Sequence, residues 1–218
     1  MSGAEKYEVN ATSTDGVRPE VREFDPREDE LRDRAVEAYG TAVVFQKRAS
    51  RYRRLIASLN FVGLAIPLTI GGIALANLLA KHWFERMGYF AGVLVAIQGI
   101  VFLWSVIANW PESLDYSAGA SAENIALYMR LKTLRAQIMS PPLPPGFDAA
   151  YASLIVRDDD QIKQDFRRAV GESEKIYGYR AALLYLQEEC FVCRKSPESM
   201  NMPWLWWKRC QGCGGPIA

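Results

Sequence analysis

Four cysteines near the C-terminus form two Cys-x-x-Cys pairs, Cys190 with Cys193 and Cys210 with Cys213, and sixteen residues separate the pairs. Two pairs at this separation are typical of a zinc site in which four thiolates surround one ion. Gly212 gives the second turn the backbone freedom that such a knuckle needs. The sequence therefore predicts a small zinc ribbon or knuckle over residues 190–218. A redox-active pair and unliganded thiols are the alternatives.

The rest of the composition contains few groups suited to chemistry. The 26 Lys and Arg against 25 Asp and Glu leave a net charge of +1, which excludes a strongly basic nucleic-acid binder. The single histidine, His82, cannot form a multi-histidine metal site, and its neighbours Trp83 and Phe84 favour a membrane–water interface. The sequence has no P-loop, nucleophile elbow or HExxH motif, so we expect no enzyme activity. Around the cysteines the positive excess is weak, which makes nucleic acid an unlikely partner and favours a structural or protein-contact role.

Two long stretches, residues 55–80 and 87–111, contain no Asp, Glu, Lys or Arg. A helix needs about 20 apolar residues to cross a hydrocarbon core of roughly 30 Å, and both stretches are long enough. The sequence therefore predicts an all-α membrane protein with an antiparallel two-transmembrane hairpin over residues 55–110. Two buried helices of a soluble bundle are the alternative.

The basic residues predict the orientation of this hairpin. Five of them directly precede the first stretch, and they are Lys47, Arg48, Arg51, Arg53 and Arg54. The link between the stretches carries only Lys81 and Arg86. The positive-inside rule then places the N-terminus in the cytoplasm, and two spans return the C-terminus to the same side.

The second stretch carries two strips of small or polar residues. Close packing against another helix is expected at Gly88, Gly92, Ala96 and Gly99. A polar strip consists of Gln98, Ser105 and Asn109. These three either form hydrogen bonds between helices or line a water-filled pore. Two helices alone enclose no lumen, so a pore requires a homo-oligomer.

The flanking segments complete the expected domain organisation. Residues 1–28 are a polar arm without a stable fold, residues 29–54 are a cytoplasmic helix that leads into the membrane, and residues 111–189 are a cytoplasmic helical region. Pro111 is expected to end the second span. Helices are then expected over residues 121–139, 147–156, 158–170 and 172–189. The aspartates at 158–160 could suggest a metal site, but acids at a helix start are favoured by capping and the helix dipole.

Several of these features together resemble a known family. They are Tyr52-Arg53-Arg54, the hairpin from Leu55 to Asn109, the stretch Ala91 to Trp104 with Gln98-Gly99-Ile100, and the helix through Ala126-Leu127-Tyr128. Over residues 30–185 the chain resembles the SLATT domains, which are SMODS and SLOG-associating two-transmembrane effectors. The resemblance implies a membrane-perforating effector of bacterial conflict or anti-phage defence in the inner membrane. It also implies a partner that makes or senses a nucleotide signal. The zinc tail is an addition that not every member carries.

Two functions from different classes remain open on the sequence alone. The first is an oligomeric effector whose cytoplasmic helices hold the membrane spans closed until a ligand or partner binds. The second is a membrane-anchored adaptor whose zinc tail recruits a protein or nucleic acid. Perforation of a membrane distinguishes them, because an adaptor does not perforate.

Overall fold

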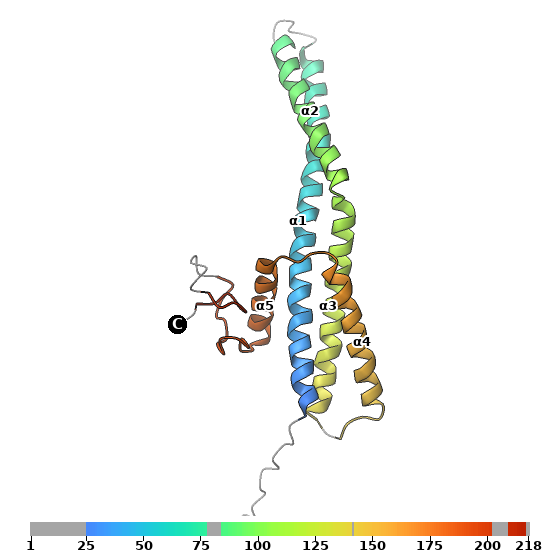
Figure 1. Ribbon diagram of the computed structural model, residues 1–218. Helices are drawn as coiled ribbons and strands as arrows, with labels where there is room; N and C mark the ends of the chain where they lie inside the picture. The colour runs from blue at the N-terminus through green and yellow to red at the C-terminus, as the bar shows by residue number, and fades with distance from the viewer. Residues whose placement is uncertain (1–24, 78–83, 141, 202–208, 217–218) are drawn as a thin grey trace, which may run out of the picture.

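The protein is elongated and helical in the part of the chain that the computed structural model describes, which is residues 25–77, 84–140, 142–201 and 209–216. The helices in this part are α1 (Pro26–Asn77), α2 (Phe84–Ile107), α3 (Trp110–Ile138), α4 (Phe147–Phe166) and α5 (Glu172–Leu186). In Figure 1, α1 and α2 form a narrow upper end, α3 and α4 widen the lower end, and α5 lies on the other side of α1 with the cysteine tail beyond it. The all-α prediction is confirmed. The polar arm up to residue 24 and His82 lie outside the described residues.

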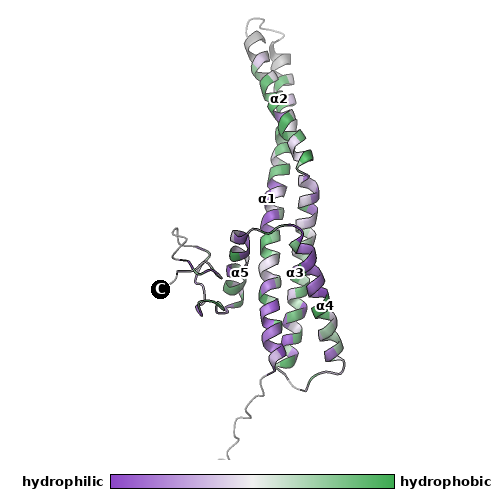
Figure 2. Cartoon of the chain, in the orientation of Figure 1, coloured by the Kyte–Doolittle hydropathy of each residue, from purple (hydrophilic) through white to green (hydrophobic). Residues whose placement is uncertain are grey.

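Helix α1 is the longest element and joins the two ends of the molecule without a break over 52 residues. Its lower half carries many charged residues, whereas its upper half is apolar, as Figure 2 shows. This helix is long and apolar enough to cross a bilayer, with a window of mean hydropathy 1.8 that is not buried in the molecule. Another span is present only if residues 92–107 of α2 and the following helix α3, bent by 47° at a short break, are taken together.

The break between α2 and α3 lies at Asn109, which adopts a left-handed conformation with φ 50° and ψ 47°. Helix α3 then begins at Trp110, with Pro111 in its first turn. Pro111 was expected to end the second span, but α2 already ends at Ile107 and Pro111 lies in the first turn of α3. The next helix was expected at residue 121, eleven residues too late. Proline starts a helix easily because the missing N–H would have no partner in the first turn.

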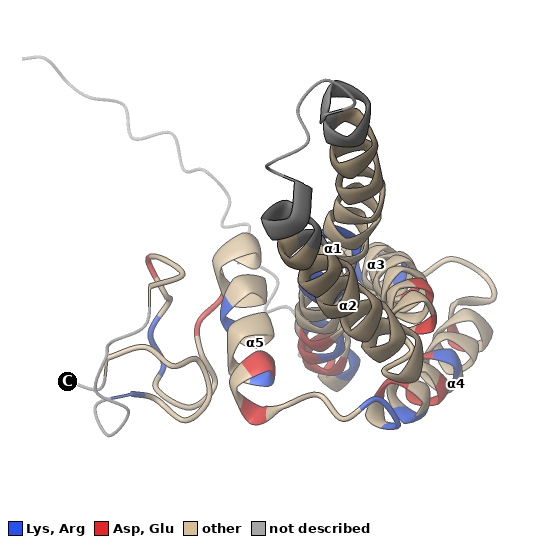
Figure 3. Ribbon diagram, turned by 90° about the horizontal axis from the view of Figure 1, so that it is seen from above, with Lys and Arg blue, Asp and Glu red and all other residues tan. Residues whose placement is uncertain are grey.

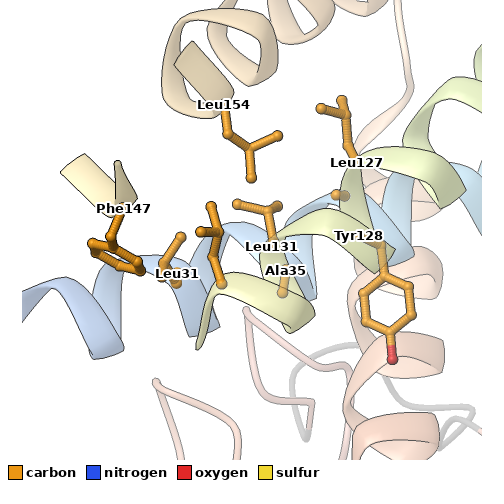
Figure 4. Close-up of a cluster of buried hydrophobic side chains, with 9 residues drawn as sticks. Leu31, Ala35, Leu127, Tyr128, Leu131, Phe147 and Leu154 are labelled. Carbon is orange, nitrogen blue, oxygen red and sulfur yellow. The ribbon is translucent and has the colours of Figure 1, made fainter. Parts of the chain in front are cut away.

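The main hydrophobic core forms where α1, α3 and α4 meet at the lower end. Its buried side chains, several of which Figure 4 shows, are Leu31, Ala35, Ala38, Leu127, Tyr128, Leu131, Leu134, Phe147 and Leu154. The Ser121 hydroxyl also donates a hydrogen bond across the α1–α3 interface to the carbonyl of Ala42, at 3.0 Å. The helix that follows the hairpin therefore packs on the lower half of α1.

Helix α4 is one continuous helix where the sequence analysis expected two. Asp158 and Asp159 therefore lie inside it and do not begin a helix. One guanidinium nitrogen of Arg34 lies 2.7 Å from a carboxylate oxygen of each. Asp158 is buried, so this ion pair supplies the charge partner that a buried carboxylate requires. The capping interpretation of the aspartate run was wrong.

Helix α5 crosses α1 in direct backbone contact. A Cβ atom placed on Gly178 would lie 2.5 Å from the carbonyl oxygen of Gly40 and 2.7 Å from a methyl carbon of Val44. Because neither glycine has a side chain at the crossing point, the two backbones approach each other more closely than other residues permit. This contact sets the position of α5, and α5 in turn carries the cysteine tail.

Candidate metal centre and its attachment to the helices

The two Cys-x-x-Cys segments fold into turns with the same hydrogen-bond pattern. The amide of Arg194 donates to the Cys190 carbonyl at 2.7 Å, and the amide of Cys190 donates to the Lys195 carbonyl at 3.1 Å. The second turn repeats this pattern, with Gly214 donating to the Cys210 carbonyl at 2.9 Å and Cys210 donating to the Gly215 carbonyl at 2.7 Å. Arg194 and Gly214 occupy equivalent positions and both have positive φ, 56° and 65°. The tail thus contains two copies of one knuckle.

The two knuckles bring all four sulfur atoms together. Every Sγ atom lies within 4.8 Å of the others. The Sγ atoms of Cys190 and Cys210 are 3.9 Å apart, and those of Cys193 and Cys213 are 3.7 Å apart. A tetrahedral ion with metal–sulfur bonds of about 2.3 Å requires sulfur separations of about 3.8 Å. The four thiols therefore fit one tetrahedral metal ion, and zinc is the ion that this donor set favours.

The surroundings of the sulfurs oppose ionisation of all four without a cation. Cys190, Cys210 and Cys213 are buried. Burial raises the pKa of Cys213 to about 12 and also raises the pKa of Cys193. Burial acts in the same direction on Cys210, but backbone N–H groups of Cys213 and Gly212 donate to its sulfur and help hold its pKa below the usual value. A divalent cation supplies the charge that four clustered thiolates need.

The tail is fastened to α5 by the buried guanidinium group of Arg180. Its Nε donates to the carbonyl of Ser199 at 2.7 Å. Its two terminal nitrogens donate to the carbonyls of Cys213 and Asn201, each at 3.0 Å. Sequence reasoning missed this residue, although an arginine followed by Ala-Ala-Leu-Leu on a packed helix is a signal that a buried charge must find acceptors.

Close packing continues from the knuckles into the helices. The cysteines share a hydrophobic cluster with Val36 of α1 and with Ala182 and Leu183 of α5. A Cβ atom on Gly212 would lie 2.9 Å from a methyl carbon of Val192, and one on Gly215 would lie 3.2 Å from the Arg180 guanidinium. The metal centre is therefore part of the packed body and does not stand apart from it.

The matched portion of the chain includes the helices and both knuckles. Residues 28–216 match the Mobilome CxxCx(11)CxxC protein family. The chain belongs to this family. Its two cysteine pairs are separated by sixteen residues, five more than the spacing in the family's description. No curated protein matches the chain, and no solved structure does. The description of this family does not mention SLATT. The resemblance to the SLATT domains, and the function that it implies, therefore stay proposals.

The predicted strips on α2 differ in their surroundings in this mobilome protein. Within 4 Å of the Cβ positions of Gly92 and Gly99 there is nothing, and Ala96 is exposed. The side-chain amide of Gln98, by contrast, lies 3.1 Å from the Cβ position of Gly63 on α1. The described part of the glycine strip therefore contacts nothing else in the same chain. In the polar strip, by contrast, Gln98 contacts α1 of the same chain.

The remaining predicted positions complete this picture for the CxxCx(11)CxxC protein. Ser105 is buried, while Asn109 is exposed at the break and donates a hydrogen bond to Glu112. Gln98, Ser105 and Asn109 therefore do not form one exposed surface in a single chain. Their role in lining a pore stays a prediction. The surroundings of Gly88 lie outside the described residues.

Proposed function

We propose that this mobilome protein is a membrane effector of a bacterial conflict or anti-phage defence system. In this proposal it is not an enzyme. Its hairpin spans the inner membrane with both termini in the cytoplasm, and a zinc ion occupies the four-cysteine centre. When a signal or a partner protein acts on the cytoplasmic helices, the chains oligomerise and perforate the membrane.

The continuity of α1 is the observation that carries this proposal. The same helix is held at its lower end by the core with α3, by Gly178 of α5 and by the cysteine cluster through Val36. At its upper end it is apolar and not buried. Any change in how α5 or the tail packs on α1 therefore acts on the apolar segment with no intervening loop.

Exposed side chains at the upper end of the molecule support the assembly of several chains. Large apolar side chains of α2, including Phe90, Ile100 and Trp104, are more than half exposed. The face with Gly92 and Gly99 is free for close approach by a neighbouring helix. In lipid, apolar side chains need no cover, but small-residue faces are the usual contacts between helices. A homo-oligomer joined at this face would be the pore-forming state.

Reconstituted vesicles test the proposal directly. The full chain in liposomes should release an entrapped dye, and crosslinking in the same vesicles should show oligomers. Gly92→Leu should abolish both, because its side chain would hold neighbouring helices apart. Leu94→Phe adds volume on the opposite side of α2 and should leave both unchanged. Dye retention by the assembled parent protein would overturn perforation.

A membrane-anchored adaptor is the second candidate function, and one contact favours it. Gln98 lies against α1 of its own chain, which leaves less polar surface for a lumen. An adaptor would keep the anchored hairpin and use the docked tail to recruit a protein or nucleic acid. Stable vesicle insertion and crosslinked oligomers without dye release would support the adaptor.

A further inference from the structure

One face of α1 packs against α5 in the lower part of the molecule. Gly40 and Val44 lie against Gly178 of α5. Higher on the same face, the ammonium group of Lys47 lies 3.6 Å from the ring centre of Tyr177. Figure 3 shows α4 and α5 on two sides of α1. Spacings of four and three residues keep these α1 positions on one face of the helix, so α5 covers this face up to Lys47.

The next two positions on this face are Arg51 and Arg54, and both side chains are exposed. They continue the same spacing of four and three residues along α1. The loop that leads into α5 is held below them by Arg48, whose guanidinium donates to the carbonyls of Arg168 and Ala169, each at 3.1 Å. Arg51 is almost one helical turn above Arg48. The arginine pair therefore lies just above the upper end of α5, where the described part of the chain leaves this face open.

The arginine pair has no counter-charge in the described part of the chain. Neither guanidinium forms an ion pair or a hydrogen bond with a described residue. Helix α1 contains no Asp or Glu after Glu37. At the upper ends of α3 and α5, two carboxylates already have partners. Glu112 pairs with Arg168, and Glu174 pairs with Arg48. The arginine pair is thus available to an anion from outside the chain.

The arginine pair also lies where the molecule changes from polar to apolar. Helices α1 and α3 run antiparallel, and Ser121 donates a hydrogen bond to the carbonyl of Ala42 across their interface. Asn109 is twelve residues from Ser121, and Arg54 is twelve residues from Ala42. The break between α2 and α3 is therefore at about the level of Arg54. The uncharged stretch of α1 begins at the next residue, Leu55. If that stretch spans a bilayer, Arg54 lies at the level of the headgroups.

We propose that Arg51 and Arg54 bind the phosphate of an anionic phospholipid in the cytoplasmic leaflet. Residues three apart on a helix have Cβ atoms about 5–6 Å apart, so both guanidinium groups can reach one phosphate. The forked N–H donors of arginine match phosphate oxygens. A zwitterionic headgroup carries an ammonium group that the pair would repel, which favours a lipid with a net negative charge. The inference rests on the proposed membrane-spanning hairpin but not on perforation.

Spin-labelled lipids test the site in the membrane itself. The full chain with its metal is reconstituted into phosphatidylcholine vesicles with a trace of spin-labelled phosphatidylglycerol or phosphatidylcholine. The immobilised fraction of each label gives its relative affinity for the protein. We expect phosphatidylglycerol to be preferred by at least about fivefold, the effect of roughly one charge near an anionic headgroup. Because both leaflets carry the label, the orientation of the chain does not affect the result.

Substitutions separate the site from a general attraction of charge. Arg54→Gln should reduce the preference to about twofold or less, because a single arginine is left to hold the phosphate. Arg53→Gln is the matched control, since Arg53 is exposed at the same level but roughly 100° or more around α1 from both members of the pair. Arg130→Gln removes an exposed charge from the lower part of α3. Both controls should keep the preference of the parent.

Several outcomes would overturn the proposal. They are equal affinities of the parent for the two labels, equal losses in Arg54→Gln and Arg53→Gln, and loss of the preference in the presence of inorganic phosphate, which would identify a free anion as the occupant. Circular dichroism and metal content check that each variant is folded, and Arg51→Gln replaces Arg54→Gln if the latter fails this check.

An alkaline wash of the vesicles separates this inference from the proposed function. A chain that the wash removes does not span the bilayer, which would contradict both. A chain that stays inserted without preferring phosphatidylglycerol would contradict the lipid site alone. A chain that prefers this lipid but releases no dye would contradict perforation and leave the lipid site supported.

Discussion

Several glycines of the lower and upper parts of the molecule have opposite surroundings. In the lower part Gly40 and Gly178 touch backbone to backbone, so the chain itself uses the space that a missing side chain leaves. In the upper part nothing lies within 4 Å of the Cβ positions of Gly71, Gly92 or Gly99. The fold of one chain explains why Gly40 and Gly178 are glycines. It gives no such reason for Gly71, Gly92 and Gly99, which are open to contacts between chains.

The largest effect on stability should come from the metal centre, because the metal stabilises the lower part of the molecule and not the upper part. Cys210→Ser, or removal of the metal by a chelator, should detach the tail from α5 and cost several kcal/mol, since binding of a structural zinc ion is itself folding free energy. Metal content and amide hydrogen exchange of α5 and the tail report this. Ser196→Ala, at an exposed tail position, should retain the metal. A metal-free protein with unchanged exchange would contradict the expectation.

A methyl group at the glycine crossing should have the next largest effect. Gly178→Ala places a Cβ atom 2.5 Å from the Gly40 carbonyl oxygen, so α5 must shift. We expect the free energy of unfolding to fall by about 1–3 kcal/mol. Gly119→Ala in α3 meets nothing within 4 Å and should stabilise the helix by up to about 1 kcal/mol. Chemical denaturation of both variants measures the difference, and equal stabilities would remove the proposed role of the crossing.

Replacing Arg180 should weaken the attachment of the tail more selectively. Arg180→Met removes hydrogen bonds to three carbonyls and should lower metal affinity by about 10–100-fold, as loss of outer-shell support does elsewhere. Competition with a coloured chelator measures the affinity. Arg157 offers a contrast, because its ion pair with Glu123 is half exposed and Arg157→Met should leave metal affinity unchanged. Similar losses of metal affinity in the two variants would mean that the hydrogen bonds of Arg180 do not stabilise the metal centre.

The smallest effect on the isolated chain should come from the upper part. Gly99→Leu meets no neighbouring atoms, so helix content and thermal unfolding in detergent should stay the same. Crosslinking in vesicles should nevertheless decrease, because the new side chain covers the open face. If thermal unfolding changes and crosslinking does not, the glycine face supports the fold of one chain, and the contrast between the two parts is lost.

Patterns that are local in sequence predicted much of this structure. The Cys-x-x-Cys pairs predicted the four-cysteine cluster because four identical donors within a short segment leave few other arrangements. A helix over residues 121–139 was expected, and it lies within α3, which packs on α1. Residue 172 was correctly expected as the start of the last helix. These features depend on neighbours in the chain, which is the information that periodicity carries.

Features that depend on distant partners were not predicted. Asp158 and Asp159 resembled helix caps, yet they pair with Arg34, more than 120 residues away. Arg180 gave no sign of which carbonyls it would bind. The contact between Gly40 and Gly178 was also missed, since each glycine looks like an ordinary weak point in its helix. Such pairings depend on how the helices are placed in space, which spacing along the chain does not give.

The crossing at Gly40 makes α1 a lever with unequal arms. From this point the helix extends 14 residues to Pro26 and 37 residues to Asn77. At about 1.5 Å per residue the arms are about 21 Å and 56 Å long. A stiff helix that turned about the crossing would move its apolar tip roughly two and a half times as far as its base. A displacement of about 1 Å at the base would thus become a shift of about 2.5 Å at the tip.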